Sequence, residues 1–316
     1  MKNLIFLCVL CFLSCSPKNI LDLFDNIDEI QGDSLNFSLF LGNPTQIVKI
    51  DSFLLIVDEY DDYLLTIVNL SSGEARRALQ QGRGPNELMG PILISQLIND
   101  SIINILERRT STIVKFKIRD VLFEEYPSIL EKITLEGGAM VPQEAENYLV
   151  ALGQNEKMLS IYDKDGKKLN EFIPYPKEAE RFQNPMDRFI TYQSDIKISN
   201  NGTKLVQAGL YYDLLNFYHI YNEQIVENKR YFFNDASIGF ENNQTKMLFD
   251  TKIHFISLYP TNDKIYASYS GNIIKGENKE YHLLCLIGTE NPLKHTNLIN
   301  RYILFGLMKQ VQRCLD

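Results

Sequence analysis

One pattern recurs five times along the chain and limits what the chain can fold into. Its first copy is Ser52–Arg77, in which two apolar runs, Phe53–Val57 and Leu64–Val68, are separated by an acidic turn and followed by the turn Ser71–Glu74. The other copies are Ser101–Lys117, Asn147–Lys168, Thr203–Ile225 and Asp263–Leu293. Short runs rich in Val, Ile, Tyr and Phe favour strands over helices. Each copy therefore predicts a β-hairpin.

The spacing of the copies indicates how these hairpins are arranged. The equivalent positions are Leu55, Ile103, Leu149, Leu205 and Ile265, which are separated by steps of 48, 46, 56 and 60 residues. Periods of roughly 40–50 residues with several strands per unit are typical of β-propeller blades. The two longer steps are explained by polar insertions at Tyr175–Arg188 and Asn234–Lys246. The sequence predicts an all-β propeller of four-stranded antiparallel blades, with the recurring hairpin as the inner hairpin of each blade.

Five blades can be recognised in the sequence before the pattern ends. They span Gln46–Gln81, Pro91–Leu135, Ala139–Pro174, Phe189–Phe232 and Lys252–Leu298. The central strands read as continuous apolar runs, as expected for strands buried on both faces.

The N-terminus predicts export and lipidation. Met1–Ser14 contains one lysine and an apolar run too short to span a bilayer stably, so it is expected to be a signal peptide. It ends in Phe12-Leu13-Ser14-Cys15, which resembles a bacterial lipobox although Phe12 departs from the small residue preferred there. Cys15 is therefore expected to carry the lipid, residues 15–34 to form a polar tether with one helical turn, and Leu35–Leu41 to be a strand that closes the ring.

Composition excludes some classes of function. The formal net charge of −8 argues against nucleic acid or an anionic membrane as a partner. Three of the five cysteines lie in the first fifteen residues, which leaves no disulfide framework and no CxxC pair for zinc. We expect no metal and no cofactor.

The most distinctive short string of the chain is Gln81–Glu87, in which Gly82 and Gly84 flank Arg83 and are followed by Pro85. It lacks the third glycine and the following helix of a dinucleotide-binding fingerprint. Two interpretations stay open. In one, the string is a turn between blades, braced by Arg83 and Glu87. In the other, it is a rim loop whose arginine binds an anionic group.

Other candidate binding residues lie in turns and insertions. Arg108 and Arg109 occupy the central turn of the second blade, and Tyr175 and Phe182 belong to a charged insertion that could form a rim loop. The turn Asp163–Lys168 superficially resembles a calcium loop, but an Asp-Gly hairpin turn explains it better.

An aromatic series marks the fourth blade, and two interpretations of it stay open: ligand stacking at a rim or packing between sheets. Its members are Tyr192, Tyr211, Tyr212, Phe217, Tyr218, Tyr221, Tyr231 and Phe232.

Taken together, the signal with its cysteine, the repeat, Gly82–Glu87 and Glu280–His295 resemble the TolB-like six-bladed β-propeller lipoproteins of Gram-negative, Bacteroides-type bacteria. Members carry a Gly-x-Gly-Pro-x-Glu string after the first blade, matched here by Gly82, Gly84, Pro85 and Glu87. The resemblance covers roughly residues 35–295 and implies architecture and location rather than a shared chemistry.

The end of the chain departs from that pattern. Six blades are implied, but Arg301–Asp316 has no second apolar run and is closer to a short amphipathic helix. We therefore expect a propeller over residues 35–300 with an incomplete last blade and an atypical tail at 301–316, the result of truncation or a frame shift near Asn300.

Two classes of function fit these observations. The first is a monomeric, non-catalytic envelope lipoprotein that binds or scaffolds a protein, peptide or glycan, anchored in the outer membrane through Cys15. Ser16–Asn19 lacks the acidic run that often marks surface export, which favours a periplasmic orientation. The alternative is a propeller enzyme, a hydrolase or lyase acting on a glycan or peptide at the channel mouth. The four dispersed histidines and the absence of a Gly-x-Ser-x-Gly elbow give that alternative no motif.

Overall fold

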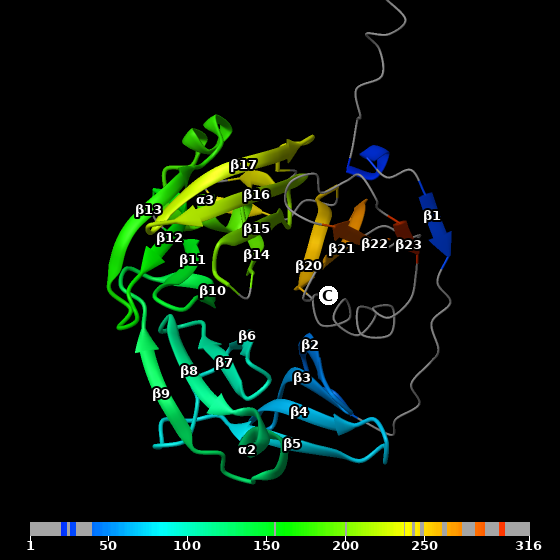
Figure 1. The fold of residues 1–316 in the computed structure, drawn as a ribbon, viewed down its shortest axis with the longest axis vertical. Helices are drawn as coiled ribbons and strands as arrows, with labels where there is room; N and C mark the ends of the chain where they lie inside the picture. Colours follow the sequence, from blue (N-terminus) through cyan, green and yellow to red (C-terminus); the bar gives the residue numbers. More distant parts are fainter. Residues whose placement is uncertain are drawn as a thin grey trace, which may run out of the picture.

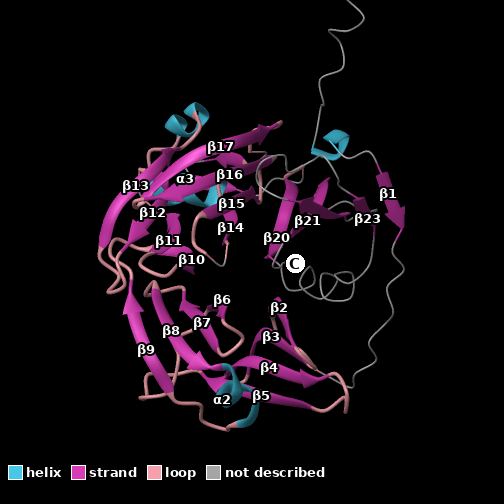
Figure 2. Ribbon diagram, viewed as in Figure 1, coloured by secondary structure: helices cyan, strands magenta, loops and turns pink. Residues whose placement is uncertain are grey.

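The computed structural model is a ring of β-sheets arranged around a central axis (Figure 1). It describes residues 20–23, 26–29, 40–154, 156–199, 201–236, 238–241, 244–246, 250–260, 264–273, 282–287 and 297–300. Within these ranges nearly all regular structure is strand (Figure 2).

The first four sheets each contain four antiparallel strands in sequence order from the axis to the rim. Blade 1 contains β2 (Pro44–Ile50), β3 (Phe53–Tyr60), β4 (Tyr63–Asn69) and β5 (Ala75–Gln80). Blade 2 contains β6 (Ile92–Ile98), β7 (Ile102–Glu107), β8 (Thr112–Lys117) and β9 (Ile129–Thr134). Blade 3 contains β10 (Ala139–Glu144), β11 (Leu149–Gly153), β12 (Lys157–Tyr162) and β13 (Lys168–Pro174). Blade 4 contains β14 (Ser194–Ile198), β15 (Lys204–Gly209), β16 (Leu214–Tyr221) and β17 (Gln224–Phe232).

The fifth sheet has an additional strand. Blade 5 contains β20 (Lys252–Pro260), β21 (Lys264–Ile273), β22 (His282–Ile287), β23 (Asn297–Asn300) and, parallel to β23, β1 (Asn26–Glu29). The remaining elements are η1 (Ile20–Leu23), α2 (Ile118–Phe123), η2 (Lys177–Arg181), α3 (Pro185–Thr191), β18 (Gly239–Glu241) and β19 (Gln244–Lys246).

The predicted propeller of four-stranded blades is confirmed, with one correction to the repeat. All five equivalent positions of the sequence pattern fall in the second strand of their blades, β3, β7, β11, β15 and β21. The recurring hairpin is thus the second and third strands of each blade, and a less apolar strand precedes it nearest the axis. Sequence reasoning took the hairpin as innermost because its apolar runs were the strongest signal.

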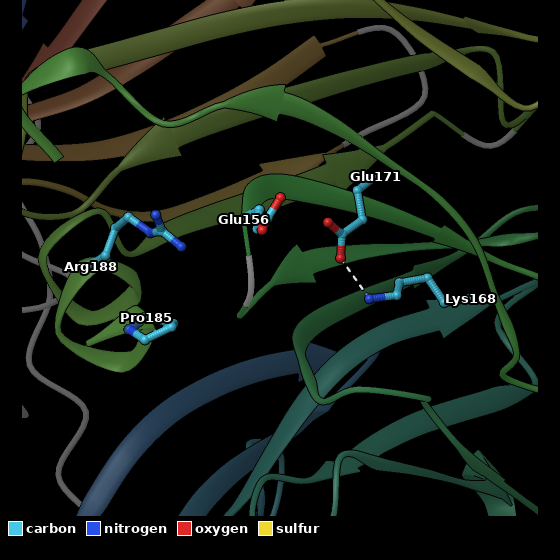
Figure 3. Close-up of a pocket in the computed structure, with 5 residues that line it drawn as sticks. All are labelled: Glu156, Lys168, Glu171, Pro185 and Arg188. Atoms are coloured by element: carbon cyan, nitrogen blue, oxygen red, sulfur yellow. Dashed lines mark hydrogen bonds and ion pairs between the residues drawn. The ribbon is translucent and has the colours of Figure 1, made fainter. Parts of the chain in front are cut away.

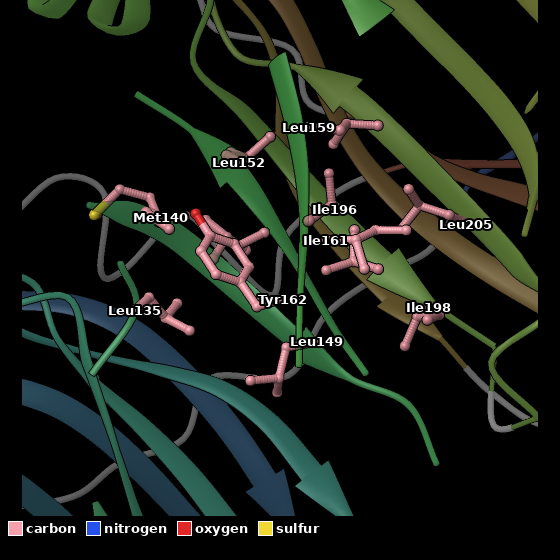
Figure 4. Packing of buried hydrophobic residues seen from close by; sticks show 14 of the residues in the cluster. Leu135, Met140, Leu149, Leu152, Leu159, Ile161, Tyr162, Ile196, Ile198 and Leu205 are labelled. Carbon is pink, nitrogen blue, oxygen red and sulfur yellow. The ribbon is translucent and has the colours of Figure 1, made fainter. Parts of the chain in front are cut away.

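The second and third strands form the core because both of their faces meet neighbouring blades. Every residue of β11 is buried, as are five consecutive residues in each of β4, β8 and β12. Figure 4 shows one such cluster, in which Leu149, Leu159 and Ile161 of blade 3 pack beside Ile196 and Leu205 of blade 4. Continuous apolar runs are therefore needed where alternation would suffice in a one-sided sheet.

Side-chain amides join the inner strands of successive blades. Gln46 on β2 donates to Ile94 O on β6 and accepts from Ile94 N, each at 2.8 Å. Gln96 on β6 makes the same pair of bonds with Glu144 on β10, at 3.0 and 2.5 Å. A β-bulge beside each glutamine shifts the strand register. These inter-blade clasps satisfy backbone groups that the sheets leave unpaired.

The N-terminal segment reaches the ring earlier than expected. The strand that joins the last blade is β1, whereas Phe40 and Leu41, the described part of the predicted closing strand, are not in a strand. Phe40 instead packs on Tyr60 of blade 1, with ring centroids 5.0 Å apart. Leu35–Leu41 was predicted as the closing strand because its residues alternate in polarity, and residues 35–39 lie outside the described residues.

Cys15, the rest of the signal and residues 301–316 lie outside the described residues. The lipidation, the domain boundaries and the interrupted end of the chain therefore stay predictions. The five described blades agree with a last blade that is incomplete.

Candidate functional site

Strand order places all the candidate loops on one face of the ring. In each antiparallel blade, the connection between strands two and three leaves from the same end as the connection to the next blade. We call this end of the ring the pocket face. It carries the connection 81–91, the turn 108–111 and the connection 175–193, which contain the candidates Gln81–Glu87, Arg108-Arg109 and Tyr175–Arg188 that the sequence analysis selected separately.

The glycine string is a closed turn built around one carboxylate. Glu87 Oε2 accepts a hydrogen bond from Gly84 N at 2.6 Å, while Gly82 N donates to Leu88 O at 3.0 Å. A Cβ on Gly82 would lie 2.0 Å from that carboxylate oxygen, and one on Gly84 would lie 2.8 Å from the carboxyl carbon. A side chain at either position would therefore displace the Glu87 carboxyl group from the turn.

The turn interpretation of this string is therefore supported for Glu87 but not for Arg83. Arg83 is exposed and makes no hydrogen bond or ion pair with a described residue. Its side chain lines a pocket of about 460 Å³ together with Glu87, Met89, Glu107 and Lys132. The loop is thus both a structural turn and one wall of a pocket.

The Arg108-Arg109 turn lies next to this pocket. Both arginines are exposed, and Arg108 N donates to Pro91 O at 3.0 Å at the entry of blade 2. Glu107, just before them, is buried and accepts a hydrogen bond from Met89 N at 2.8 Å. One side-chain and one backbone hydrogen bond thus join the turn to the residues that follow the glycine string, and both arginines are exposed.

The two aromatic candidates of the insertion pack against the protein and do not form an exposed binding surface. Phe182 is only 4% exposed and lies in a cluster with Tyr192 and Tyr212. Tyr175 is half-buried, donates to Gly153 O at 3.1 Å, and has its pKa raised by burial. Phe182 therefore cannot stack on a ligand in this conformation. Sequence reasoning could not separate an exposed loop from one that folds back as η2 and α3 onto blade 3.

The insertion does create the larger pocket, of about 730 Å³. It is lined by Glu156, Lys168, Glu171, Pro185 and Arg188. Figure 3 shows Glu156 between Arg188 of α3 and the Lys168–Glu171 pair on β13, whose ends are 2.6 Å apart. Arg188 also lies over the Tyr175 ring, 4.8 Å from its centroid. Sequence reasoning missed Glu156, Lys168, Glu171 and Arg188, which carry no motif.

Two buried polar groups between blades 4 and 5 were also missed. Asp213 Oδ1 and His254 Nδ1 lie 3.7 Å apart with side chains 1% and 4% exposed, and neither atom has a hydrogen-bond partner. Burial raises the pKa of Asp213 to about 6 and lowers that of His254 to about 4. Tyr269 and the backbone N–H of Ile20 donate to the Asp213 carboxylate. The group is closed to solvent, which suits a structural role.

The turn Asp163–Lys168 is the hairpin turn that the sequence predicted. Asp163 Oδ1 accepts from the backbone N–H groups of Asp165 and Lys167, at 3.1 and 2.8 Å, which is a self-capped hairpin turn. Lys164 of this turn contacts Glu144 at 2.8 Å. Burial disfavours the charged Glu144, but hydrogen bonds from Lys164, Lys115 and Asn104 outweigh it and lower its pKa.

Most of the aromatic series of blade 4 packs between sheets. Buried members are Tyr192, Tyr211, Tyr212, Phe217 and Tyr218, whereas Tyr221 and Phe232 are exposed.

Fold and site together define a β-propeller with charged pockets on one face. The chain belongs to the TolB-like 6-blade propeller-like family, whose model matches residues 23–284. The five described blades thus belong to a family of six-bladed propellers. None of the helices in the described part of the chain is long and apolar enough to cross a bilayer.

Solved structures with a similar fold are distant in sequence. A Bacteroides fragilis protein described as exported is 16% identical with a TM-score of 0.51, over 88% of this chain and 75% of that chain. A duf4221 family member from Bacteroides vulgatus is 9% identical with a TM-score of 0.47, over 83% and 82%. A protein from Bacteroides uniformis described as a 6-phosphogluconolactonase is 12% identical with a TM-score of 0.44, over 83% and 71%. Among curated proteins, none matches the chain significantly.

Proposed function

We propose that the chain is an exported lipoprotein whose propeller binds a protein or peptide on its pocket face. The observation that carries this proposal is the composition of the two pockets found there. Both are lined by side chains of both charge signs: Glu156, Lys168, Glu171 and Arg188 in one, and Arg83, Glu87, Glu107 and Lys132 in the other. A peptide segment offers charges of both signs and backbone groups for such walls.

The anchoring part of the proposal rests on the N-terminal sequence. The Leu13-Ser14-Cys15 ending supports cleavage before Cys15 and lipidation of its side chain. The exported description of the Bacteroides fragilis protein agrees with an envelope location. We place the lipoprotein in the outer membrane facing the periplasm, as a monomer. A glycan would also fit polar pockets, but the described residues that line the two pockets include no aromatic ring.

An enzyme remains the alternative, and the described residues favour it less. The groups with the most perturbed acid–base behaviour, Asp213 and His254, are sealed between blades rather than facing a pocket. A general acid or base must be within reach of its substrate.

The test is site-specific photo-cross-linking in the native envelope. A photoreactive residue at Glu156 on the pocket face is compared with one at Arg119, an exposed residue of α2 on the opposite face. We expect one discrete adduct from position 156 and none from position 119. Arg188→Ala should reduce the adduct at least severalfold, whereas Arg119→Ala should leave it unchanged. Equal adducts from both positions, or insensitivity to Arg188→Ala together with Arg83→Ala, would refute binding at this face.

A further inference from the structure

The N-terminal segment is fixed to the ring only five residues after the predicted lipid site. Ile20 is fully buried in the cluster between blades 4 and 5, beside Phe217, Phe255 and Tyr269. Its backbone N–H donates to the buried Asp213 carboxylate. Leu21 and Leu23 pack against the same cluster. A buried side chain and a backbone hydrogen bond thus hold the segment at a fixed position on the ring.

The chain length limits how far Cys15 can lie from the seam, which is the contact between blades 4 and 5 where Ile20 is buried. Ile20 lies five positions after Cys15, and an extended chain spans at most about 3.3–3.6 Å per residue, or roughly 17 Å in total. Asp213 lies in the connection between the second and third strands of blade 4, so the attachment is at the pocket-face end of the seam. A lipid on Cys15 therefore holds this rim near the bilayer surface.

The rim beside the attachment has side chains suited to a membrane interface. Tyr231 packs against the same cluster as Ile20. Phe232, the last residue of β17, is 37% exposed. Lys229 lies over the Tyr231 ring and Arg230 over the Phe232 ring, at 5.1 and 5.3 Å. Neither cation forms an ion pair with a described residue. Aromatic rings and free cations together are typical of protein surfaces at the headgroup level.

We propose that residues 229–232, at the pocket-face end of β17, contact an anionic phospholipid bilayer, with the propeller tilted onto the seam of blades 4 and 5. The aromatic rings enter the headgroup region, and Lys229 and Arg230 bind lipid phosphates. The occupant is a bilayer rather than a protein because the anchor's short reach already brings this rim to the membrane. This inference rests on the lipidation of Cys15 in the proposed function, and it adds that the pocket face opens beside the membrane.

The test measures how close two labelled positions are to lipid. Full-length lipidated protein in a Cys314→Ser background is reconstituted in phosphatidylethanolamine–phosphatidylglycerol vesicles whose acyl chains carry a bromine quencher. A fluorophore is attached at Phe232→Cys or at Phe123→Cys. Phe123, 64% exposed on α2 at the opposite face, is the matched control. We expect position 232 to lose about half of its fluorescence, as for a side chain 5–10 Å into the interface, and position 123 to lose almost none.

Two further arms separate the causes. Lys229→Glu with Arg230→Glu should remove most of the quenching at position 232 while the protein stays lipidated and vesicle-bound. Equal or absent quenching at 232 and 123 in bound, lipidated protein overturns the orientation but leaves the lipoprotein assignment intact. Absence of incorporated fatty acid, with Cys15→Ala and wild type behaving alike, overturns both the lipoprotein assignment and this inference.

Discussion

The turn built on Gly82, Gly84 and Glu87 leads to a quantitative test of why this string needs glycine. In Gly82→Ala, the new methyl group would lie 2.0 Å from Glu87 Oε2, so the carboxylate must leave its hydrogen bond with Gly84 N. The backbone of Gly82 is not in the left-handed region, so the cost comes from this contact alone. A hydrogen bond to a charged group contributes about 1.5–3 kcal/mol, and we expect a loss of about 2 kcal/mol.

The assay is urea denaturation of the single and double variants. Glu87→Ala alone should also cost about 2 kcal/mol, because it breaks the same bond. In the Glu87→Ala background, Gly82→Ala should then cost nearly nothing, which gives a coupling energy of about 2 kcal/mol. For a domain of this size each kcal/mol corresponds to about 2–4 °C in Tm.

Gly90→Ala provides the control for this cycle. Its Cβ would meet Leu64 Cδ2 at 2.9 Å rather than Glu87, so its cost should not depend on Glu87. The explanation fails if Gly82→Ala is neutral, or if its cost is unchanged when Glu87 is replaced by alanine.

Three further predictions concern buried groups. Arg77→Ala should destabilise the fold by about 3 kcal/mol in urea titrations, because it leaves the fully buried Asp58 carboxylate without its cation at 2.5 Å; a second change, Asp58→Asn, should restore part of the loss. Gln96→Leu should lower the free energy of unfolding by about 2 kcal/mol, because it breaks both bonds to the backbone of Glu144. Gln96→Glu can accept but not donate, so its stability should lie between those of wild type and Gln96→Leu. Equal stability of all three proteins would exclude a contribution of these bonds. Asp213→Asn tests pH dependence: because burial raises the pKa of Asp213 to about 6, its contribution to stability is present below its unfolded value of 3.8 and is lost as the pH rises through 6. The stability of the Asn variant relative to wild type should therefore increase between pH 4 and 6, by at most about 3 kcal/mol, and a flat difference would contradict the shift.

The sequence predicted the architecture well because blade packing leaves a strong signal. The second and third strands must be apolar on both faces, and this requirement produced the repeat that places Leu55, Ile103 and Leu149 at equivalent positions. The first strand of each blade was harder to find because it lines the axis with both polar and apolar residues. Gln46 and Gln96 form the inter-blade clasps in these strands. The sequence does not distinguish a glutamine that bonds to the next blade from one that faces solvent.

The candidate site was predicted only in part. The string Gly82–Glu87 was found because glycine, proline and a charge at fixed spacing indicate a constrained turn. Phe182 was selected for exposure and proved buried, because the direction in which an insertion folds depends on tertiary contacts. Arg188 was missed although it belongs to the same insertion, and Asp213 and His254 could not be paired from positions 41 residues apart.

The inter-blade clasps of Gln46 and Gln96 have a consequence for the geometry of the pocket face. Each amide engages both the N–H and the C=O of a single residue in the next blade, much as a neighbouring strand would. Sliding one blade by a single residue along the axis would break both bonds at once. The clasps therefore fix the positions of blades 1, 2 and 3 relative to one another along the axis. The pocket-face loops of blades 1, 2 and 3 are thereby kept at the same level by hydrogen bonds that run between blades as well as within each sheet.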